Sequence, residues 1–325
     1  MGDILKGRVA IVTGSGHGIG RAIAIALAAE GAKVVTNNRK PGGKVKANVP
    51  EAVYNSLDAD TKKKLEEDAE KFSGDAETTA QAIRDAGGDA TAVFADVGNF
   101  DGAKNLVDTA VNTYGKLDIV VNVAGILAQG KVDEITEEEW DVCLDTKPKG
   151  HFNVLHFAVP HMIEQGYGRI LNCASGAFMG DRFFDDSHYC ASNAGAVGLT
   201  RACATELWSR GITANAFCPS ASTRPRVQVA PDPNSNRPAF PPAPPPEAIT
   251  PFIVFLCSEA SAHVSGTVFS THGNMIGRHR EPTVCRTMIK PVEEGLWTVE
   301  EIDKVVDAQL LNGYHSIVEN LIPGR

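Results

Sequence analysis

Short apolar runs bounded by glycine alternate with amphipathic stretches along most of the chain. An apolar run of roughly four to eight residues predicts a buried strand, and a longer amphipathic stretch predicts a helix that covers a sheet. This alternation is typical of βα units, so we predict an α/β fold with a doubly wound, seven-stranded parallel sheet. Strands are expected at residues 8–12, 33–37, 91–94, 117–121, 169–173, 213–217 and 267–270, and helices at 18–30, 102–114, 137–153 and 189–209.

Two segments interrupt the alternation. Residues 40–73 are rich in charge and lengthen the link between the second strand and the next helix, so we expect an exposed helix there. Residues 225–251 hold ten of the eighteen prolines, which excludes a regular helix or a central strand. This proline-rich loop follows the carboxyl end of a strand, where ligands bind in an open α/β sheet. It is a candidate lid, with a stiff surface loop or a partner-binding strap as the alternative.

The end of the chain differs in character from the rest. We assign residues 1–280 to a single domain and residues 281–325 to a carboxy-terminal extension. Within the extension, Thr298 is placed to cap a helix with Glu301 as its capping-box partner. We expect the extension to pack on the same domain or on a partner subunit.

The composition is that of an ordinary globular protein, with a formal charge of −9 and a pI near 5.5. An acidic chain is repelled by the nucleic-acid backbone and by anionic membranes, so we expect neither as a partner. Seven scattered cysteines without paired ligand spacing indicate reduced thiols and a cytoplasmic protein. The amino terminus leads into the first strand without the apolar stretch of a signal peptide or membrane span.

A small group of acidic residues near a histidine is a candidate metal site. Asp181, Asp185, Asp186 and His188 lie close in the sequence but lack a regular ligand spacing. We therefore assign no metal site. His188 is interpreted as a surface histidine.

Residues 13–20 read Thr-Gly-Ser-Gly-His-Gly-Ile-Gly and connect the first strand to the first helix. Glycines at this place let the backbone approach a pyrophosphate and direct helix amino-terminal amides at it. The sequence therefore predicts a dinucleotide site. We expect its contacts in the glycine loop to come from Gly14, Ser15, His17, Gly18, Ile19 and Gly20.

The end of the second strand bears on the identity of the dinucleotide. An acidic residue there binds the ribose diol of NAD and repels the extra phosphate of NADP. This chain has Asn38 followed by Arg39. The amide removes the repulsion, and Arg39 with His17 can meet a 2′-phosphate. We favour NADP over NAD, with a surface role for Arg39 as the alternative.

Further motifs follow the glycine loop in order. They are Ala95-Asp96-Val97, Asn122-Val123-Ala124-Gly125, and Ser175, which lies fourteen residues before Tyr189. Together with the glycine loop they resemble the short-chain dehydrogenase/reductase family over about residues 7–275, apart from the two interrupting segments. The resemblance implies a Rossmann-like fold, NADP or NAD as the cofactor, and a homodimer or homotetramer.

The resemblance also implies further cofactor contacts. An aspartate at the position of Asp96 contacts the adenine in the family. A hydroxyl after the proline at the position of Pro219 often contacts the nicotinamide amide, and Thr223 is the nearest candidate. The implied set adds Asp96, Val97, Asn122, Ala124, Gly125, Tyr189, Pro219 and Thr223 to the glycine loop, Asn38 and Arg39.

The family's catalytic tyrosine exchanges a proton with the substrate oxygen, a serine orients the carbonyl, and a lysine four residues after the tyrosine lowers the tyrosine pKa. Tyr189 and Ser175 match the first two positions, but Asn193 occupies the lysine position. Asn193 can still bond the ribose hydroxyls, although it carries no charge. A tyrosine near its free pKa of about 10 is only about one part in a thousand ionised at neutral pH. Dehydrogenation, which needs a base, should suffer most.

A second departure lies upstream. The family has an asparagine in a run such as Asp-Val-Asn-Leu-Lys-Gly, whereas residues 145–150 read Asp-Thr-Lys-Pro-Lys-Gly. Lys147 therefore stands at the asparagine position, and the pair Lys147 and Asn193 resembles an exchange of the two family residues. Pro148 is expected to bend this helix, because it cannot donate to the Leu144 carbonyl.

Two hypotheses follow from the exchange. In the first, Lys147 reaches the pocket from the opposite side and restores a positive charge near Tyr189, so the chain is an NAD(P)-dependent oxidoreductase. In the second, the chain is a catalytically silent subunit that supports an active paralogue in a hetero-oligomer. A Lys147 turned to solvent beside Lys149 would favour the second. The intact Tyr189 and Ser175 favour the first.

Three further segments bear on the substrate. Residues 126–129, 138–141 and 219–224 resemble the (R)-3-hydroxyacyl-CoA dehydrogenase domains of multifunctional β-oxidation enzymes and their steroid-dehydrogenase relatives. The resemblance implies a secondary alcohol or ketone on a bulky apolar or acyl-CoA substrate. Phe178, Phe183 and Phe184 lie between Ser175 and Tyr189, where a pocket wall is expected. Ordinary core packing is the alternative for these rings.

Overall fold

A computed structural model of the chain describes residues 2–44, 51–126, 130–180, 186–223, 243–280 and 286–311. The chain divides into two compact units, Met1–His279 and Arg280–Arg325. The first unit holds the sheet and the candidate site. The described part of the second unit contains two short helical elements, and the packing of this unit on the domain or on a partner stays a prediction.

The first unit is built on one sheet of eight strands in the order β3-β2-β1-β4-β5-β6-β7-β8. The seven predicted strands are all present and pair in parallel. An eighth strand, β8, was not predicted and pairs antiparallel with β7. The strands are β1 (Val9–Val12), β2 (Lys33–Asn38), β3 (Asp89–Phe94), β4 (Ile119–Asn122), β5 (Gly168–Cys173), β6 (Ile212–Ser220), β7 (Val268–His272) and β8 (Met275–Arg278).

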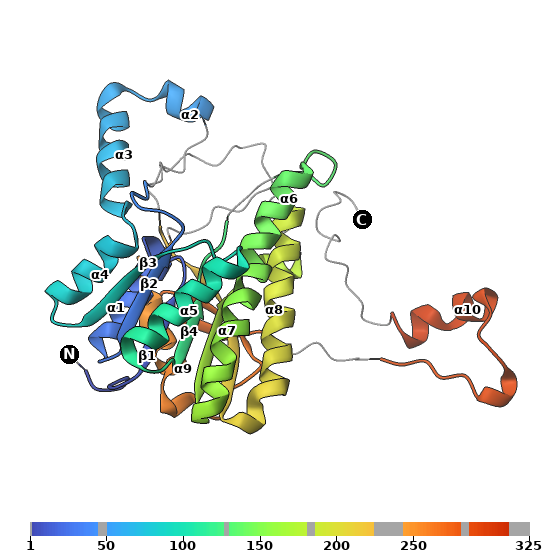
Figure 1. The fold of residues 1–325 in the computed structure, drawn as a ribbon. Helices are drawn as coiled ribbons and strands as arrows, with labels where there is room; N and C mark the ends of the chain where they lie inside the picture. Colours follow the sequence, from blue (N-terminus) through green and yellow to red (C-terminus); the bar gives the residue numbers. More distant parts are fainter. Residues whose placement is uncertain are drawn as a thin grey trace. The chain divides into compact units, whose positions relative to one another are not determined.

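Helices cover both faces of the sheet, as Figure 1 shows. One layer contains α1 (Gly18–Ala29), α4 (Ala76–Asp85) and α9 (Thr250–Cys257), and the other contains α5 (Phe100–Tyr114), α7 (Gly150–Gln165) and α8 (Ser187–Leu207). Alternate residues of β1 point to opposite faces, so Val9 and Ile11 join one apolar core while Ala10 and Val12 join the other. This arrangement confirms the predicted α/β fold.

The charged segment after β2 forms two helices rather than the single exposed helix expected. They are α2 (Glu51–Ser56) and α3 (Ala59–Phe72). Asp58 caps α3 by accepting a hydrogen bond from the Thr61 amide at 2.8 Å. Leu65 and Ala69 are buried, so one face of α3 packs inward while its charges stay in solvent.

The predicted helix over 137–153 is broken in the middle. It consists of α6 (Glu137–Leu144), a π-helical turn at Asp145–Lys149, and α7. Lys147 has non-helical backbone angles of φ −152° and ψ 122°, and the Lys147–Pro148 peptide is cis. The break lies where Pro148 was expected to bend the helix, since a proline has no amide hydrogen to donate to the preceding turn.

Short 3₁₀ turns connect several of these elements: η2 (Gly176–Met179), η3 (Trp208–Arg210), η4 (Pro246–Ile249) and η5 (Glu259–Ser261). Most of the proline-rich loop, which is the candidate lid, lies outside the described residues. Its last part is described and forms η4 and the first turn of α9. Within the described ranges, no helix is both long and apolar enough to cross a membrane.

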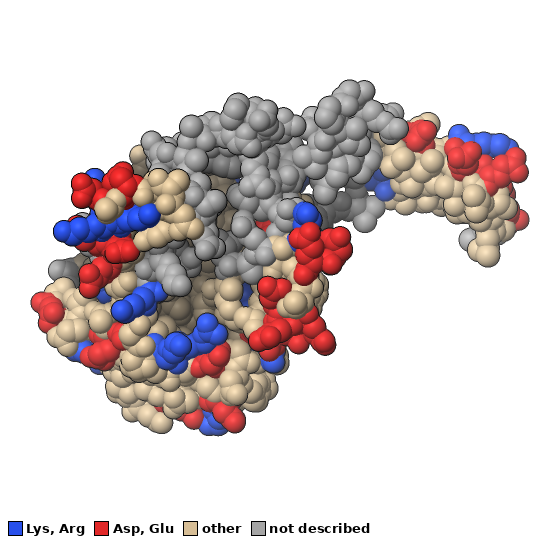
Figure 2. Space-filling view, turned by 90° about the horizontal axis from the view of Figure 1, so that it is seen from above, with Lys and Arg blue, Asp and Glu red and all other residues tan. Residues whose placement is uncertain are grey.

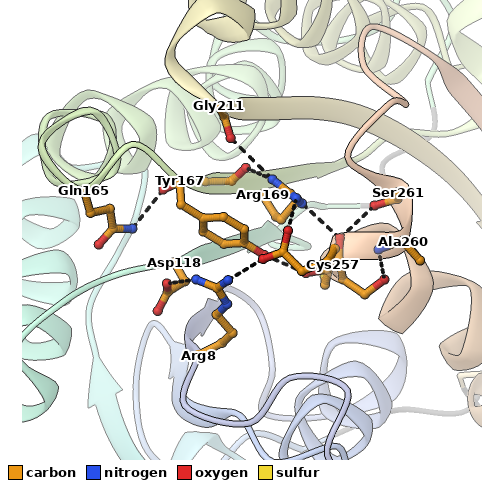
Figure 3. Close-up of polar contacts among 12 residues, drawn as sticks. Arg8, Asp118, Gln165, Tyr167, Arg169, Gly211, Cys257, Ala260 and Ser261 are labelled. Carbon is orange, nitrogen blue, oxygen red and sulfur yellow. Dashed lines mark hydrogen bonds and ion pairs between the residues drawn. The ribbon is translucent and has the colours of Figure 1, made fainter.

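The amino ends of the strands carry a polar cluster, shown in Figure 3. The Asp118 carboxylate accepts hydrogen bonds from Arg8 Nη1 at 2.8 Å and from the Val9 amide at 2.9 Å. The guanidinium carbons of Arg8 and Arg169 lie over the Tyr167 ring, 3.5 and 4.3 Å from its centroid. Burial raises the pKa of Tyr167 to about 12. This cluster joins β1, β4 and β5 at the edge opposite the glycine loop, so we interpret it as structural.

Arg169→Met is expected to lower the free energy of unfolding by about 3 kcal/mol. The side chain is 2% exposed and donates to the carbonyls of Gly168, Gly211 and Ser258, which would lose a buried donor. Thermal unfolding followed by circular dichroism should show the melting temperature falling by roughly 5–10 °C. As a control, Lys104→Met removes an exposed ion pair with Asp108. This change should shift the melting temperature by about 1 °C or less. Equal melting temperatures for the Arg169 variant and the wild type would contradict the structural role.

The second unit contains η6 (Val292–Glu294) and α10 (Val299–Gln309). The predicted capping box is present, because Thr298 Oγ1 accepts from the Glu301 amide and Glu301 accepts from the Thr298 amide. The Lys290 ammonium lies 2.8 Å from the Glu301 carboxylate, and this hydrogen bond lowers the Glu301 pKa to about 2.

Candidate active site

A cavity of about 340 Å³ opens at the carboxyl ends of β1, β2, β3 and β4. The glycine loop forms its floor, and the segments after the other three strands form its walls. Figure 2 views the molecule from above, where acidic and basic side chains of the described residues are interspersed rather than gathered into one broad basic surface. Twelve of the predicted cofactor-binding residues line the cavity: Gly14, His17, Gly18, Ile19, Gly20, Asn38, Arg39, Asp96, Val97, Ala124, Gly125 and Thr223.

The glycine loop has the close contacts that a phosphate cradle needs. Gly14 adopts a φ of +62°, and a Cβ added there would stand 2.9 Å from the Ala124 backbone. A Cβ on Gly20 would stand 2.3 Å from the Gly14 carbonyl oxygen. His17 precedes the first turn of α1 without capping it through its side chain. The loop therefore brings backbone amides at a helix start to the cavity, which suits the pyrophosphate of a dinucleotide.

Four predicted cofactor residues do not line this cavity: Ser15, Asn122, Pro219 and Tyr189. The Ser15 hydroxyl is fully buried, donates to the Val12 carbonyl at 2.7 Å and accepts from the Asn37 amide at 2.8 Å. Asn122 is also buried and donates to Asn172 Oδ1 at 3.0 Å. Both side chains hold neighbouring strand ends together instead of facing the cavity.

Eight further residues that the motifs did not predict also line the cavity. They are Gly16, Asn37, Lys40, Gly43, Ala95, Val123, Ile126 and Thr146. Most of these are chain neighbours of predicted residues, so motif extension by one or two positions would have found them. Lys40 and Gly43 are different, because they belong to the segment that interrupts the βα alternation.

At the end of β2, Asn38 is held by the protein itself. Its Oδ1 accepts from the Ala76 amide at 2.6 Å, and its Nδ2 donates to the Lys40 carbonyl at 2.6 Å. Arg39 and Lys40 are exposed and line the cavity. Two positive side chains therefore stand at this end of the cavity, while the Asn38 amide joins two backbone segments.

Ser175 and Tyr189 meet where β5 ends and α8 begins. Ser175 caps η2, and Tyr189 lies in the first turn of α8. Burial raises the Tyr189 pKa to about 12, although hydrogen bonds with the side chains of Ser175 and Asn193 act in the opposite direction. With this pKa the phenol is protonated at neutral pH.

Lys147 points inward and is only 5% exposed. Its Nζ donates to Asn193 Oδ1 at 3.2 Å, and Asn193 Nδ2 in turn donates to the Tyr189 carbonyl at 2.8 Å. A Cβ added at Gly125 would stand 3.0 Å from Lys147 Cε and 3.3 Å from Nζ. Lys149, by contrast, is exposed and pairs with Asp145. The two positions that resemble an exchange are thus in direct contact, with the ammonium beside a cavity-lining glycine.

The Lys147 ammonium shares its surroundings with one buried carboxylate, because the charge of Asp186 raises the pKa of both Cys143 and Tyr189. No described acidic side chain forms an ion pair or hydrogen bond with its ammonium, and burial raises the pKa values of the neighbouring thiols Cys143, Cys173 and Cys218. Burial, reinforced by the Lys147 charge, lowers the pKa of His151 to about 3. A buried cation without a counter-ion is costly.

Comparison with known proteins agrees with this geometry. The family model described as short chain dehydrogenase matches residues 8–73 and 62–230. The chain belongs to the short-chain dehydrogenase family. Members are oxidoreductases that use a nicotinamide cofactor, NAD or NADP.

Several relatives of this short-chain dehydrogenase show how far the similarity extends. The mouse (Mus musculus) peroxisomal multifunctional enzyme type 2 is 33% identical over 276 residues, which are 84% of this chain but only 33% of that protein. The Thermotoga maritima 3-oxoacyl-(acyl-carrier-protein) reductase is 30% identical over 279 residues, or 84% of this chain and 99% of that protein. A crystal structure of a short chain dehydrogenase from Mycobacterium avium has a TM-score of 0.72 and 31% identity, covering 94% of this chain and 95% of the other.

The other side chains predicted near the catalytic site of this short-chain dehydrogenase differ in their surroundings. His188 is 1% exposed, so its interpretation as a surface histidine is wrong. It is buried because the first turn of α8 packs inward. Phe178 packs its ring against His279 at 5.1 Å and contacts a small apolar core. Phe183 and Phe184 lie outside the described residues. In the part of the chain that the structure describes, no group of three or more side chains is arranged to hold a metal.

Proposed function

We propose that this short-chain dehydrogenase interconverts a ketone and a secondary alcohol on a bulky apolar or acyl-thioester substrate, with Lys147 supplying the charge that the motif lysine supplies in its relatives. The observation that carries the proposal is the contact between Lys147 Nζ and Asn193 Oδ1 at 3.2 Å. It supports an inward Lys147 that shares one site with Tyr189. A Lys147 turned to solvent would have left Asn193 as a plain defect.

We assign one role to each of the four catalytic residues. Tyr189 transfers the proton to or from the substrate oxygen, and Ser175 donates a hydrogen bond that orients the carbonyl. The bound nicotinamide supplies or accepts the hydride. Lys147 stabilises the negative charge that develops on the phenol oxygen, and Asn193 holds the ammonium in place.

The favoured direction is reduction of the ketone. The Tyr189 pKa of about 12 keeps the phenol protonated at neutral pH, so Tyr189 is ready to donate a proton. Oxidation needs the phenolate, whose population rises tenfold with each pH unit below that pKa. The rate of oxidation should therefore increase with pH well into the alkaline range, while reduction is already possible at neutral pH.

The cofactor is proposed to be NADP rather than NAD. Arg39 and Lys40 line the ribose end of the cavity, and His17 lines it from the glycine loop. Asn38 replaces the acid that would repel a 2′-phosphate, and its amide is already engaged by backbone groups. Positive side chains at the ribose end, in place of an acid at position 38, favour a phosphate monoester over a diol.

The substrate class rests on the relatives. One is named as a reductase of 3-oxoacyl groups on acyl-carrier protein, and another as a peroxisomal multifunctional enzyme. We propose a 3-oxoacyl or 3-hydroxyacyl thioester, acted on by a homodimer or homotetramer.

The test is carbonyl reduction by the purified chain alone. A 3-oxoacyl-CoA substrate is mixed with NADPH or NADH, and loss of nicotinamide absorbance is followed at neutral pH. We expect turnover, with a higher kcat/KM for NADPH than for NADH. Binding of NADPH without turnover of any 3-oxoacyl thioester would contradict the enzymatic proposal.

A silent subunit is the second candidate function. The observation that favours it is the absence of a lysine at position 193, where Asn193 is fully buried in α8. A silent chain would show no reduction alone and would raise the activity of a co-expressed paralogue. The reduction assay separates the two functions directly.

A further inference from the structure

The segment that interrupts the alternation after β2 is closed at its base by two hydrogen bonds. The Gly74 amide donates to the Gly43 carbonyl at 2.9 Å, and the Gly42 amide donates to Asp75 Oδ2 at 2.9 Å. We call residues 42–43 and 74–75 the neck. A Cβ added at Gly43 would stand 2.3 Å from the Gly74 carbonyl oxygen, so the two segments of the neck are in close contact.

Asp75 uses its two carboxylate oxygens for different purposes. Oδ1 accepts from the Thr78 amide at 2.9 Å and caps α4, while Oδ2 accepts from the Gly42 amide across the neck. Hydrogen bonds from the Gly42 and Thr78 amides lower the Asp75 pKa, so the side chain is a carboxylate at neutral pH. One oxygen serves the helix that follows it, and the other serves the neck.

The neck is also a wall of the dinucleotide cavity. Arg39, Lys40 and Gly43 line that cavity, and Gly42 lies between the last two. On the other side, Asp75 presses on the glycine loop, since a Cβ on Gly16 would stand 2.9 Å from the Asp75 Cα. Asp75 therefore contacts both the segment that carries the positive side chains, through Gly42, and the glycine loop, at Gly16.

We propose that Asp75 is a positioning residue for the adenosine half of the dinucleotide. This inference rests on the proposed cofactor site. It adds a residue that acts on the cofactor indirectly, without touching it. Through Gly42, Asp75 holds residues 39–43 in the conformation that meets the ribose. Residues 42 and 43 are glycines, which have wide conformational freedom when they are not held. A wall ordered in advance binds the ligand without having to be ordered during binding.

Asp75→Asn separates the two uses of the side chain. Asparagine caps a helix about as well as aspartate, so its oxygen can still accept from the Thr78 amide. Its other group is a donor and would face the Gly42 amide, which is also a donor. We expect the Kd for NADPH to rise on the order of tenfold, mainly through faster dissociation. Fluorescence titration and stopped-flow displacement of NADPH measure these values.

The chain contains a matched control. Asp58 caps α3 in the same Asp-x-x-Thr pattern, with its oxygens bound to the Thr61 amide and hydroxyl, both at 2.8 Å. Asp58→Asn makes the same chemical change at a cap that contacts no cavity wall, and we expect an unchanged Kd. Hydrogen–deuterium exchange should rise in the peptide covering residues 39–44 for Asp75→Asn and not for Asp58→Asn.

Gly43→Ala provides a second variant that opens the neck without altering the cap of α4, and it should also weaken NADPH binding. Equal Kd values for wild type, Asp75→Asn and Gly43→Ala would overturn the inference. Equal weakening by Asp58→Asn and Asp75→Asn would also overturn it, because a cap alone would then explain the effect. If the wild type bound neither NADPH nor NADH, the cofactor site itself would be wrong, which is a distinguishable result.

Discussion

Lys147→Met is expected to lower kcat for carbonyl reduction by roughly a thousandfold and to leave the Kd for NADPH nearly unchanged. The proposal requires the Lys147 ammonium to come within about 4 Å of the phenolate in the reacting complex, where a cation is worth about 4 kcal/mol at an effective dielectric of about 20, or about three pKa units. Methionine has similar length and flexibility and no charge. Steady-state kinetics with a 3-oxoacyl-CoA, together with NADPH titration, measure both quantities.

Lys149→Met is the matched control for this prediction. Lys149 is two residues away, exposed and paired with Asp145 at 2.8 Å. We expect turnover within about twofold of the wild type for that variant. Undiminished turnover in Lys147→Met would remove Lys147 from the mechanism, whatever its position in the structure.

The double variant Lys147→Asn with Asn193→Lys is expected to restore the activity that each of the two single substitutions removes. Asn193→Lys alone places a second ammonium where Lys147 Nζ now meets Asn193 Oδ1 at 3.2 Å, so two buried like charges would repel each other. Lys147→Asn alone removes the ammonium from this contact and leaves two amides in its place. The double variant has one cation and one amide again, in the arrangement of the family. We expect its kcat/KM to exceed that of either single variant by roughly a hundredfold, near the upper end of pairwise coupling energies.

The four kcat/KM values of this cycle and the four melting temperatures are measured together. The melting temperatures show whether a loss of activity is a loss of folding. If the double variant were only as active as the product of the two single effects, Lys147 and Asn193 would act independently. The exchange interpretation would then fail, even if Lys147→Met alone were inactive.

Much of the fold could be predicted because its signals are local. Seven strands were found at the expected places, since an apolar run between glycines reports burial on both faces of a parallel sheet. The edge strand β8 was missed because it is short and mostly exposed. The helix α4 has ordinary amphipathic spacing but begins directly after the charged segment, which concealed its start. The break at Lys147 was foreseeable only as a bend, from the chemistry of Pro148.

The candidate site could be predicted less completely. The sequence pointed to Ser175, Tyr189 and the glycine loop through short motifs. It did not indicate that Ser15 and Asn122 are turned away from the cavity, because a motif records spacing along the chain and not the direction of a side chain. Asp75 and Asp58 have the same local pattern, and nothing in that pattern reveals that one of them also bonds to Gly42.

Residue order alone was therefore sufficient to predict the α/β architecture and to propose the glycine loop, Tyr189 and Ser175 as parts of the site. Periodicity, glycine conformations and helix caps depend on residues a few positions apart. The contact between Lys147 and Asn193 joins residues 46 positions apart, and the burial of Lys147 depends on how a broken helix packs against α8. Long-range packing, which local patterns do not encode, turned an apparent defect at position 193 into a pair of residues that share one site.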